Sequence, residues 1–221
     1  MTNKLFYLFD RKEIIEATSS EYRKFLKQAG YANIDRCSGL LIEKNILRND
    51  QSVKDSAKYL KIKLNENDDC VVNINQSNGR RLIKKIGGKL LTTQLMYGLF
   101  IPFLIDQLAQ GNKEVQSTID EMTDTKAEWL EDLILDKSRL RIGSQEKKLT
   151  LVGRDGYFDK SDLNEFGYPT KIKDSGEYYY WYPRNNEIAA FRDWDSELDL
   201  DLNWGPSFVS VRLGVRLAKF L

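Results

Sequence analysis

The sequence predicts an α+β fold, because helix-like patterns come first along its 221 residues and strand-like patterns come later. Apolar side chains recur at helical spacing in residues 13–29, 76–87, 92–110 and 124–135. After residue 137, short alternating stretches between turn residues predict strands at 139–142, 148–152, 178–182, 188–191, 198–202 and 209–217. We expect the helices near 78–87 and 92–110 to pack on a small antiparallel sheet that includes residues 209–217.

Capping residues support the helix boundaries. Ser, Thr and Asn side chains cap helix N-termini, and Gly ends helices because it readily adopts left-handed conformations. Such N-terminal signals lie at 18–20, 76–78 and 92–93, and glycines lie at 30, 87–88 and 111. The apolar run at 95–105 is too short to span a bilayer and predicts a buried helix that bends at Pro102. Residues 1–66, with strand-like stretches at 40–47 and 59–64, form an N-terminal mixed α/β extension, an accessory segment of unknown role.

The composition excludes several classes of activity. The chain has no histidine, which removes Ser-His-Asp and Cys-His catalytic arrangements and His-dependent zinc sites. Lys and Arg total 34 and Asp and Glu total 33, and the resulting net charge of +1 argues against an electrostatic grip on nucleic acid by the whole protein. Cys37 and Cys70 are too few for a disulfide scaffold or a thiolate metal cage. We therefore expect no metal and no cofactor.

Two segments leave alternatives open. Residues 155–165 are dense in oxygen ligands, but Asn164 stands where a calcium loop needs glycine and the distal Glu is missing. The segment is therefore either a solvated loop or a calcium site.

The aromatic run 178–182 alternates faces on a strand, with Tyr179 and Trp181 opposite the other three tyrosines. It predicts either core packing or a partly exposed aromatic platform.

Residues 191–213 combine a regular apolar phase with an unusual polar phase. Leucines at 198, 200 and 202 alternate with Asp199, Asp201 and Asn203, so we expect buried leucines and exposed aspartates. Residues 192–205 contain one arginine, five acids and the tryptophans Trp194 and Trp204. Arg, Trp and carboxylates gathered on one exposed surface are typical of a binding surface. An acidic solvated loop with two core tryptophans is the alternative.

The C-terminal motifs resemble a known family. The stretch GEYYYWYPRNNEIAAF is followed by twenty-one mixed residues and the closing LGVRLAKFL, and GGKLLTTQLMY, EWLED and GYFDKSDLNEFGYPTKI precede it. In this order and spacing, over about residues 70–221, they resemble the target (variable) proteins of diversity-generating retroelements. The resemblance implies a C-type lectin-like fold of the formylglycine-generating-enzyme subtype over residues 67–221, with two main helices on a small antiparallel sheet, long loops and a variable segment at 192–212. The chain lacks the Glu-Pro-Asn triplet of calcium-dependent sugar-binding lectins, so the fold implies no sugar binding.

The resemblance also implies which positions vary. In this family a reverse transcriptase copies a template repeat and mutates its adenines, so template Asn codons become scattered residues. Positions reachable from an Asn codon in this way are Arg192, Ser196, Asp199, Asp201, Asn203, Gly205, Phe208, Ser210 and Arg212. Trp194, Glu197 and Trp204 are not reachable from it, so they are fixed in the template or derive from another adenine-containing codon. All twelve form the implied ligand-binding surface.

The function implied by the resemblance is non-enzymatic binding of a macromolecule through a hypervariable surface. The excess of acids predicts a protein ligand with a cationic patch, and neither nucleic acid nor a membrane span is expected. One alternative is a viral or surface attachment module without active diversification. The other is a relative of the formylglycine-generating oxidases, which would need a cysteine pair late in the chain. No signal peptide is predicted, so we expect a cytoplasmic location, or display on a virion or cell surface by another component.

Overall fold

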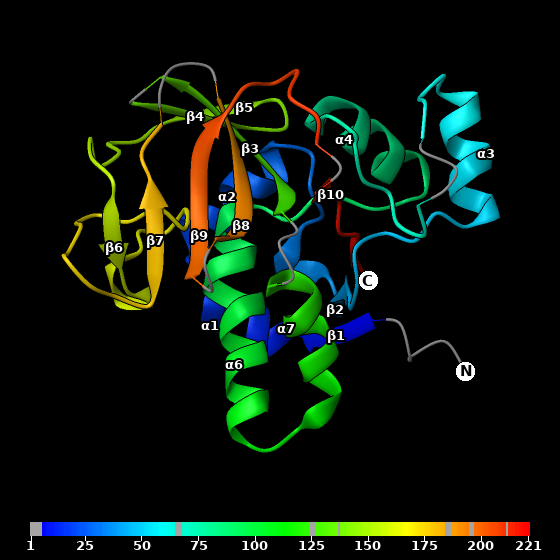
Figure 1. Ribbon diagram of the computed structural model, residues 1–221. Coiled ribbons are helices and arrows are strands. Elements are labelled where there is room, and N and C mark those ends of the chain that lie inside the picture. Colours follow the sequence, from blue (N-terminus) through cyan, green and yellow to red (C-terminus); the bar gives the residue numbers. More distant parts are fainter. Residues whose placement is uncertain are drawn as a thin grey trace.

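The computed structural model combines helices with two sheets (Figure 1), which confirms a fold of mixed helices and strands. It describes residues 6–64, 68–123, 127–136, 138–183, 187–194, 197–210 and 212–221. Its helices are α1 (Arg11–Ala17), α2 (Ser20–Gln28), α3 (Gln51–Tyr59), α4 (Gln76–Lys85), α5 (Thr93–Leu95), the π-helix η2 (Met96–Phe100), α6 (Ile101–Ala109) and α7 (Gln116–Thr123), with short 3-10 turns η1 (Ile34–Arg36), η3 (Lys113–Val115) and η4 (Lys160–Asp162). Among these residues, no helix is both long and apolar enough to cross a membrane.

The larger sheet has the strand order β5-β4-β3-β8-β9-β7-β6, and β10 pairs with β3. Its strands are β3 (Ala127–Asp136), β4 (Arg139–Ile142), β5 (Gln145–Lys148), β6 (Gly156–Phe158), β7 (Tyr178–Trp181), β8 (Glu187–Trp194), β9 (Glu197–Trp204) and β10 (Leu213–Gly214). Neighbouring strands run antiparallel except in the pairs β7–β9 and β10–β3. Residues 188–191 and 198–202 lie in strands, as the sequence predicts.

The two faces of this sheet have different coverings. One face packs against the helical segment α5–η2–α6, where the Tyr97 ring lies 5.5 Å from Tyr178 and 6.2 Å from Phe191. The other face is covered by α3 and α4 around Trp129 and Ile188, in a second apolar core. In Figure 1, α3 and α4 lie to one side of the sheet, away from β6 and β7. The second face is therefore open over β9 and β7, where the candidate site lies.

The N-terminal residues share a sheet with the C-terminus. Strand β1 (Phe6–Asp10) pairs with β2 (Gly39–Glu43), and β11 (Ala218–Phe220) pairs with the other side of β2. Phe9 and Leu40 are fully buried in the same core as Leu95 of α5. The segment assigned as accessory therefore contributes directly to the main core of the described structure.

The predicted helix at 92–110 is confirmed, with a local change of pitch. The Thr92 hydroxyl accepts from the Leu95 amide at 3.3 Å, and the buried Asp132 carboxylate accepts from the Thr93 amide at 2.8 Å, so the helix N-terminus is capped twice. The π turn of η2 follows and precedes Pro102, which lies in the first turn of α6. Proline has no amide hydrogen to donate to the preceding turn, so this is where an α-helical ladder is weakest.

The helix predicted at 124–135 is wrong: residues 127–136 form β3. This central strand is buried on both faces, so its sequence lacks the alternation of a half-exposed strand. Its buried carboxylates have distant partners. The Glu128 carboxylate accepts a hydrogen bond from Nε of the buried Arg216 at 2.8 Å, and Glu131 forms an ion pair with Arg80 at 3.1 Å. Local periodicity could not indicate partners that lie far away in the sequence.

The single strand predicted at 209–217 is also wrong. Only Leu213–Gly214 forms a strand of the large sheet, and the chain then crosses to the small sheet as β11. Arg216 stands between the two strands and donates to the carbonyl oxygens of Glu43 and Lys44. These bonds hold the crossing segment against β2. The strand predicted at 59–64 is likewise absent: α3 ends at Tyr59, and residues 60–64 form a turn and irregular chain.

Candidate ligand-binding face

The hairpin β8–β9 sorts its side chains onto the two faces of the sheet. Leu200 and Leu202 are fully buried against Phe191 and the helical segment, as predicted, whereas Leu198, also predicted to be buried, is only partly buried there. Arg192 pairs with Asp199, and Ala190 pairs with Asp201, on the opposite face. The alternation read from the sequence is therefore confirmed for the apolar phase.

A β-bulge adds Trp204 to the face that carries the aspartates. Ala190 faces Asp201 and Ile188 faces Trp204, so three steps along β9 match two steps along β8. Without the extra residue, Trp204 would point to the opposite face from Asp201. The register shift instead brings its ring to 6.3 Å from Trp129 and 4.3 Å from Phe208, on the outer face.

Arg192 lies at the centre of this face between two tryptophans. Its guanidinium carbon is 5.5 Å from the Trp181 ring centre and 5.9 Å from the Trp204 ring centre. The same guanidinium lies 3.4 Å from carboxylate oxygens of both Asp199 and Asp201. Cation–π and charge contacts therefore hold the side chain over the sheet.

The expectation that Asp199 and Asp201 are exposed is wrong. Their exposed fractions are 2% and 3%, because Arg192 and the two tryptophan rings cover them. Asp199 Oδ2 also accepts from the Trp181 indole at 2.9 Å, while its Oδ1 has no hydrogen-bond partner among the described residues. Burial raises the pKa of Asp199 to about 6, against the opposing effects of Trp181 and Arg192. Burial also raises the pKa of Asp201.

Aromatic rings extend the face across the neighbouring strands. Trp181 lies 5.1 Å from Tyr179, which lies 4.9 Å from Tyr157 on β6. All three are partly exposed, whereas Tyr178 and Tyr180 are buried. We call Tyr157, Tyr179, Trp181, Arg192, Trp204 and Phe208 the aromatic row. The predicted alternation of residues 178–182 is confirmed over 178–181.

The loop after β9 continues this surface. Phe208 is 41% exposed and Val209 is 47% exposed, beside the stacked Trp204. The Phe208 amide donates to the Gly205 carbonyl at 2.9 Å, which closes a turn around Pro206 and sets the Phe208 ring against Trp204. Phe208, Val209 and the Trp204 ring thus form a contiguous apolar surface, the kind of patch that marks interaction sites when it is large.

The other predicted site residues fall into three groups. Asn203, near the end of β9, and Arg212, in the segment after it, are exposed, and Gly205 is partly exposed. Ser210 is partly buried, and its carbonyl accepts from Asn73, so it faces the α4 side of the molecule. Ser196 lies outside the described residues, and so do the side chains of Trp194 and Glu197, although both of these residues lie in described strands.

The predicted set omitted the three aromatic residues on β6 and β7. The signal for two of them was present in the sequence, because Tyr179 and Trp181 occupy the phase opposite the buried tyrosines. Tyr157 had no such signal. It joins the face only because β6 pairs with β7, which places Tyr157 opposite Tyr179.

The acidic loop at 155–165 uses its carboxylates internally. Lys173 Nζ lies 2.5 Å from Asp159 and 2.6 Å from Asp162, and Lys171 lies 2.9 Å from Asp162. Hydrogen bonds from Lys173 lower the pKa of Asp159. Two ammonium groups therefore pair with the carboxylates of this loop. In the part of the chain that the structure describes, no group of Cys, Asp and Glu is arranged to hold a metal ion.

Comparison with known proteins identifies no relative: no protein family, no curated protein and no solved structure matches this chain.

Proposed function

We propose that this protein is a non-enzymatic binding protein, whose C-type lectin-like domain presents the aromatic row and the 205–212 loop to a macromolecular ligand. The observation that carries the proposal is Arg192 held between Trp181 and Trp204, beside the exposed Phe208. Arg and Trp are the side chains most enriched among the residues that dominate binding energies. A preorganised guanidinium loses little side-chain entropy when a ligand binds.

A catalytic role has less support from the described residues. Cys37 is buried, and burial raises the pKa of its thiol, which disfavours the reactive thiolate. The cation of the aromatic row, Arg192, is paired with the carboxylates of Asp199 and Asp201. This arrangement suits recognition of a surface.

We further propose that the loop positions of this face are diversified by a retroelement through adenine-directed mutagenesis. Exposed positions such as Asn203, Phe208 and Arg212 can be exchanged with changes in folding free energy of about 0.5 kcal/mol or less. Arg192, Asp199 and Asp201 are coupled by charge, so a change at one of them affects the others. Under this proposal, the exposed positions can vary independently, whereas Arg192, Asp199 and Asp201 can vary only together.

The ligand proposed is a protein with a cationic patch. Within residues 192–205, Arg192 offsets one of five acids, so the segment retains a net negative charge. A complementary patch of Lys and Arg would accelerate association, and the rate would fall as salt screens the charges.

A display experiment tests the proposal. One library randomises Asn203, Phe208 and Arg212, and a matched library randomises the exposed Gln51, Asp55 and Lys58 on α3. Both libraries are selected against the same panel of basic and acidic proteins. We expect specific binders from the first library alone, and most from the basic targets. Equal yields from both libraries would contradict the proposal.

The DNA separates diversification from a fixed attachment module. A near-duplicate of the DNA encoding residues 190–221, differing only at adenines and close to a reverse-transcriptase gene, supports diversification. An attachment module would have no such duplicate and would still bind through the aromatic row.

A further inference from the structure

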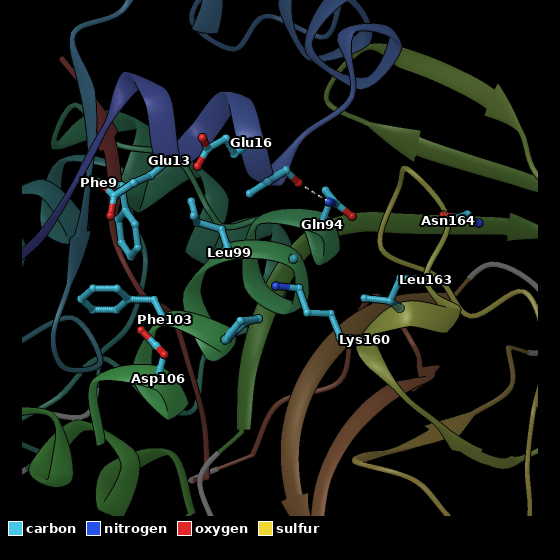
Figure 2. Close-up of a pocket in the computed structure, with 13 residues that line it drawn as sticks. Phe9, Glu13, Glu16, Gln94, Leu99, Phe103, Asp106, Lys160, Leu163 and Asn164 are labelled. Carbon is cyan, nitrogen blue, oxygen red and sulfur yellow. Dashed lines mark hydrogen bonds between the residues drawn. The ribbon is translucent and has the colours of Figure 1, made fainter. Parts of the chain in front are cut away.

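A cleft separate from the aromatic row lies between α1, the π turn and the turn η4 (Figure 2). Its volume is about 520 Å³, which is within the range of small-molecule sites. Phe9, Leu99, Pro102 and Phe103 supply its apolar lining. None of the residues that line it belongs to the aromatic row.

The amide of Gln94 is an unsatisfied acceptor in this cleft. Gln94 is 7% exposed and lines the cavity, and its Nε2 donates to the Ala17 carbonyl at 2.8 Å. That bond fixes the orientation of the amide. The buried Oε1 has no hydrogen-bond partner among the described residues. A buried acceptor without a partner costs free energy that a ligand donor would recover.

Gly98 makes this position of the amide possible. A Cβ atom on Gly98 would lie 2.5 Å from Gln94 Nε2, so any side chain there would displace the Gln94 amide. Gly98 lies in the π turn, and π turns inside helices are frequent at functional sites. The absence of a side chain at Gly98 therefore leaves room for the Gln94 amide beside the cleft.

The charged lining favours a cation. Glu13, Glu16 and Asp106 line the cleft, opposed by the single ammonium of Lys160, which reaches into it in Figure 2. Glu13 accepts from the Asp10 amide and Asp106 accepts from Gln110, so neither contact adds a positive charge, whereas Glu16 lies 3.7 Å from the ammonium of the exposed Lys12. With Lys12 counted, three carboxylates face two ammonium groups, and the cleft keeps a negative excess of one charge.

We propose that this cleft binds an organic cation, namely an ammonium group on an apolar stem. The ammonium lies near the carboxylates of Glu16 and Asp106 and donates to Gln94 Oε1 once the amide turns toward the cleft, while the stem contacts Leu99 and Phe103. The group could belong to a free amine or to a lysine side chain of a polypeptide, and both have the same chemistry.

Titration with three matched probes tests the proposal on the full chain. Phenethylamine carries the cation, 2-phenylethanol keeps a donor without the charge, and phenylacetate reverses the charge. Calorimetry and the NMR signal of the Gln94 side-chain amide report binding. We expect saturable binding of phenethylamine, at least five-fold weaker binding of the alcohol, and no binding of phenylacetate. The dipeptide Nα-acetyl-Lys-Phe-NH₂, whose lysine side chain keeps its ammonium group, distinguishes a free amine from a polypeptide lysine as the ligand. If it binds as tightly as phenethylamine, the ligand is a polypeptide lysine.

Variants connect binding to the named residues. Glu16→Gln and Asp106→Asn should each weaken phenethylamine binding about two- to five-fold, as removal of an exposed charge does. Asp55→Asn is the matched control, because Asp55 and Asp106 are both exposed helical acids that accept from a glutamine four positions away. Gly98→Ala should displace the Gln94 amide and weaken binding with the charges unchanged, while circular dichroism verifies the fold.

Two results would overturn the proposal. One is equal affinity for the amine and the alcohol, or no binding of either at millimolar concentration. The other is an Asp55→Asn control that weakens binding as much as Asp106→Asn, because the charge effect would then not be local to the cleft.

Discussion

Replacement of Asp199 by Asn should stabilise this protein at neutral pH. Burial raises the pKa of Asp199 from 3.8 to about 6, so the folded state holds the ionised carboxylate at a cost. At 1.36 kcal/mol for each pH unit, the cost is about 3 kcal/mol above pH 7. Asn cannot ionise, and its side-chain oxygen can still accept from the Trp181 indole. We expect a gain of about 1–3 kcal/mol in unfolding free energy at pH 7.5.

The sign of the pH dependence follows from the raised pKa of Asp199. The unfolded chain ionises this group near pH 3.8, whereas the folded chain keeps its proton up to about pH 6. The contribution to stability is therefore fully present below pH 3.8 and is lost as pH rises through 6. The gain from Asp199→Asn should accordingly fall from its value at pH 7.5 to near zero at pH 4.

Urea unfolding at pH 7.5, 6 and 4, followed by circular dichroism and tryptophan fluorescence, measures the effect. The exposed Asp55→Asn serves as the control and should change stability by about 0.5 kcal/mol or less at each pH. If Asp199→Asn destabilises the fold by 1 kcal/mol or more at pH 7.5, the attraction to Arg192 outweighs burial and the reasoning is refuted. Arg192→Gln tests the same charge pair from the other side. It should lower the free energy of unfolding by about 3 kcal/mol at pH 7.5, and by less in the Asp199→Asn background.

Three further changes test the fold and the face. Leu200→Ala should cost about 2–4 kcal/mol in urea unfolding because the side chain is fully buried, whereas the exposed Asn203→Ser should cost about 0.5 kcal/mol or less; equal costs would contradict the face assignment. Arg216→Met should cost about 3–5 kcal/mol at pH 7, because it leaves Glu128 buried without its partner, and an unchanged melting temperature would contradict this role. Phe208→Ala should weaken binding of any ligand selected on this face about ten-fold or more with little change in melting temperature, as a partly exposed anchor does; unchanged affinity in surface plasmon resonance would place the ligand elsewhere.

The sequence was sufficient where local chemistry decides the structure. The caps at Ser19, Asn75 and Thr92 each accept an amide hydrogen bond in the first turn of a helix, close to where capping residues predicted the starts. The alternating leucines of β9 correctly predicted which face of the strand is buried, because side-chain alternation along a strand depends only on its own residues. Strands at 139–142 and 188–191 followed from the same reasoning.

The sequence was insufficient where a distant partner decides the structure. A strand with three buried carboxylates is improbable in a core, yet Arg216, Arg80 and the Thr93 amide each compensate one of these carboxylates of β3. The burial of Asp199 depends in the same way on Arg192 and on Trp181, which belongs to another strand pair. No spacing rule connects these residues before the sheet order is known. The pattern assigned the aspartates to the correct face but could not show what covers them.

The coupling of Arg192, Asp199 and Asp201 limits how this face could diversify. If a template specifies Asn at all three positions, the neutral set buries amides and no charge. A single exchange to Asp or Arg buries one charge without a partner, which costs about 3–5 kcal/mol and is comparable to the whole stability of a marginal domain. The present set reduces this cost, because one guanidinium lies 3.4 Å from both carboxylates. Only combinations with compensating charges, or with none, keep the sheet folded. If the proposed diversification occurs, we therefore expect the exchanges that cost little to lie on the loop beyond β9, where Phe208 and Arg212 are exposed.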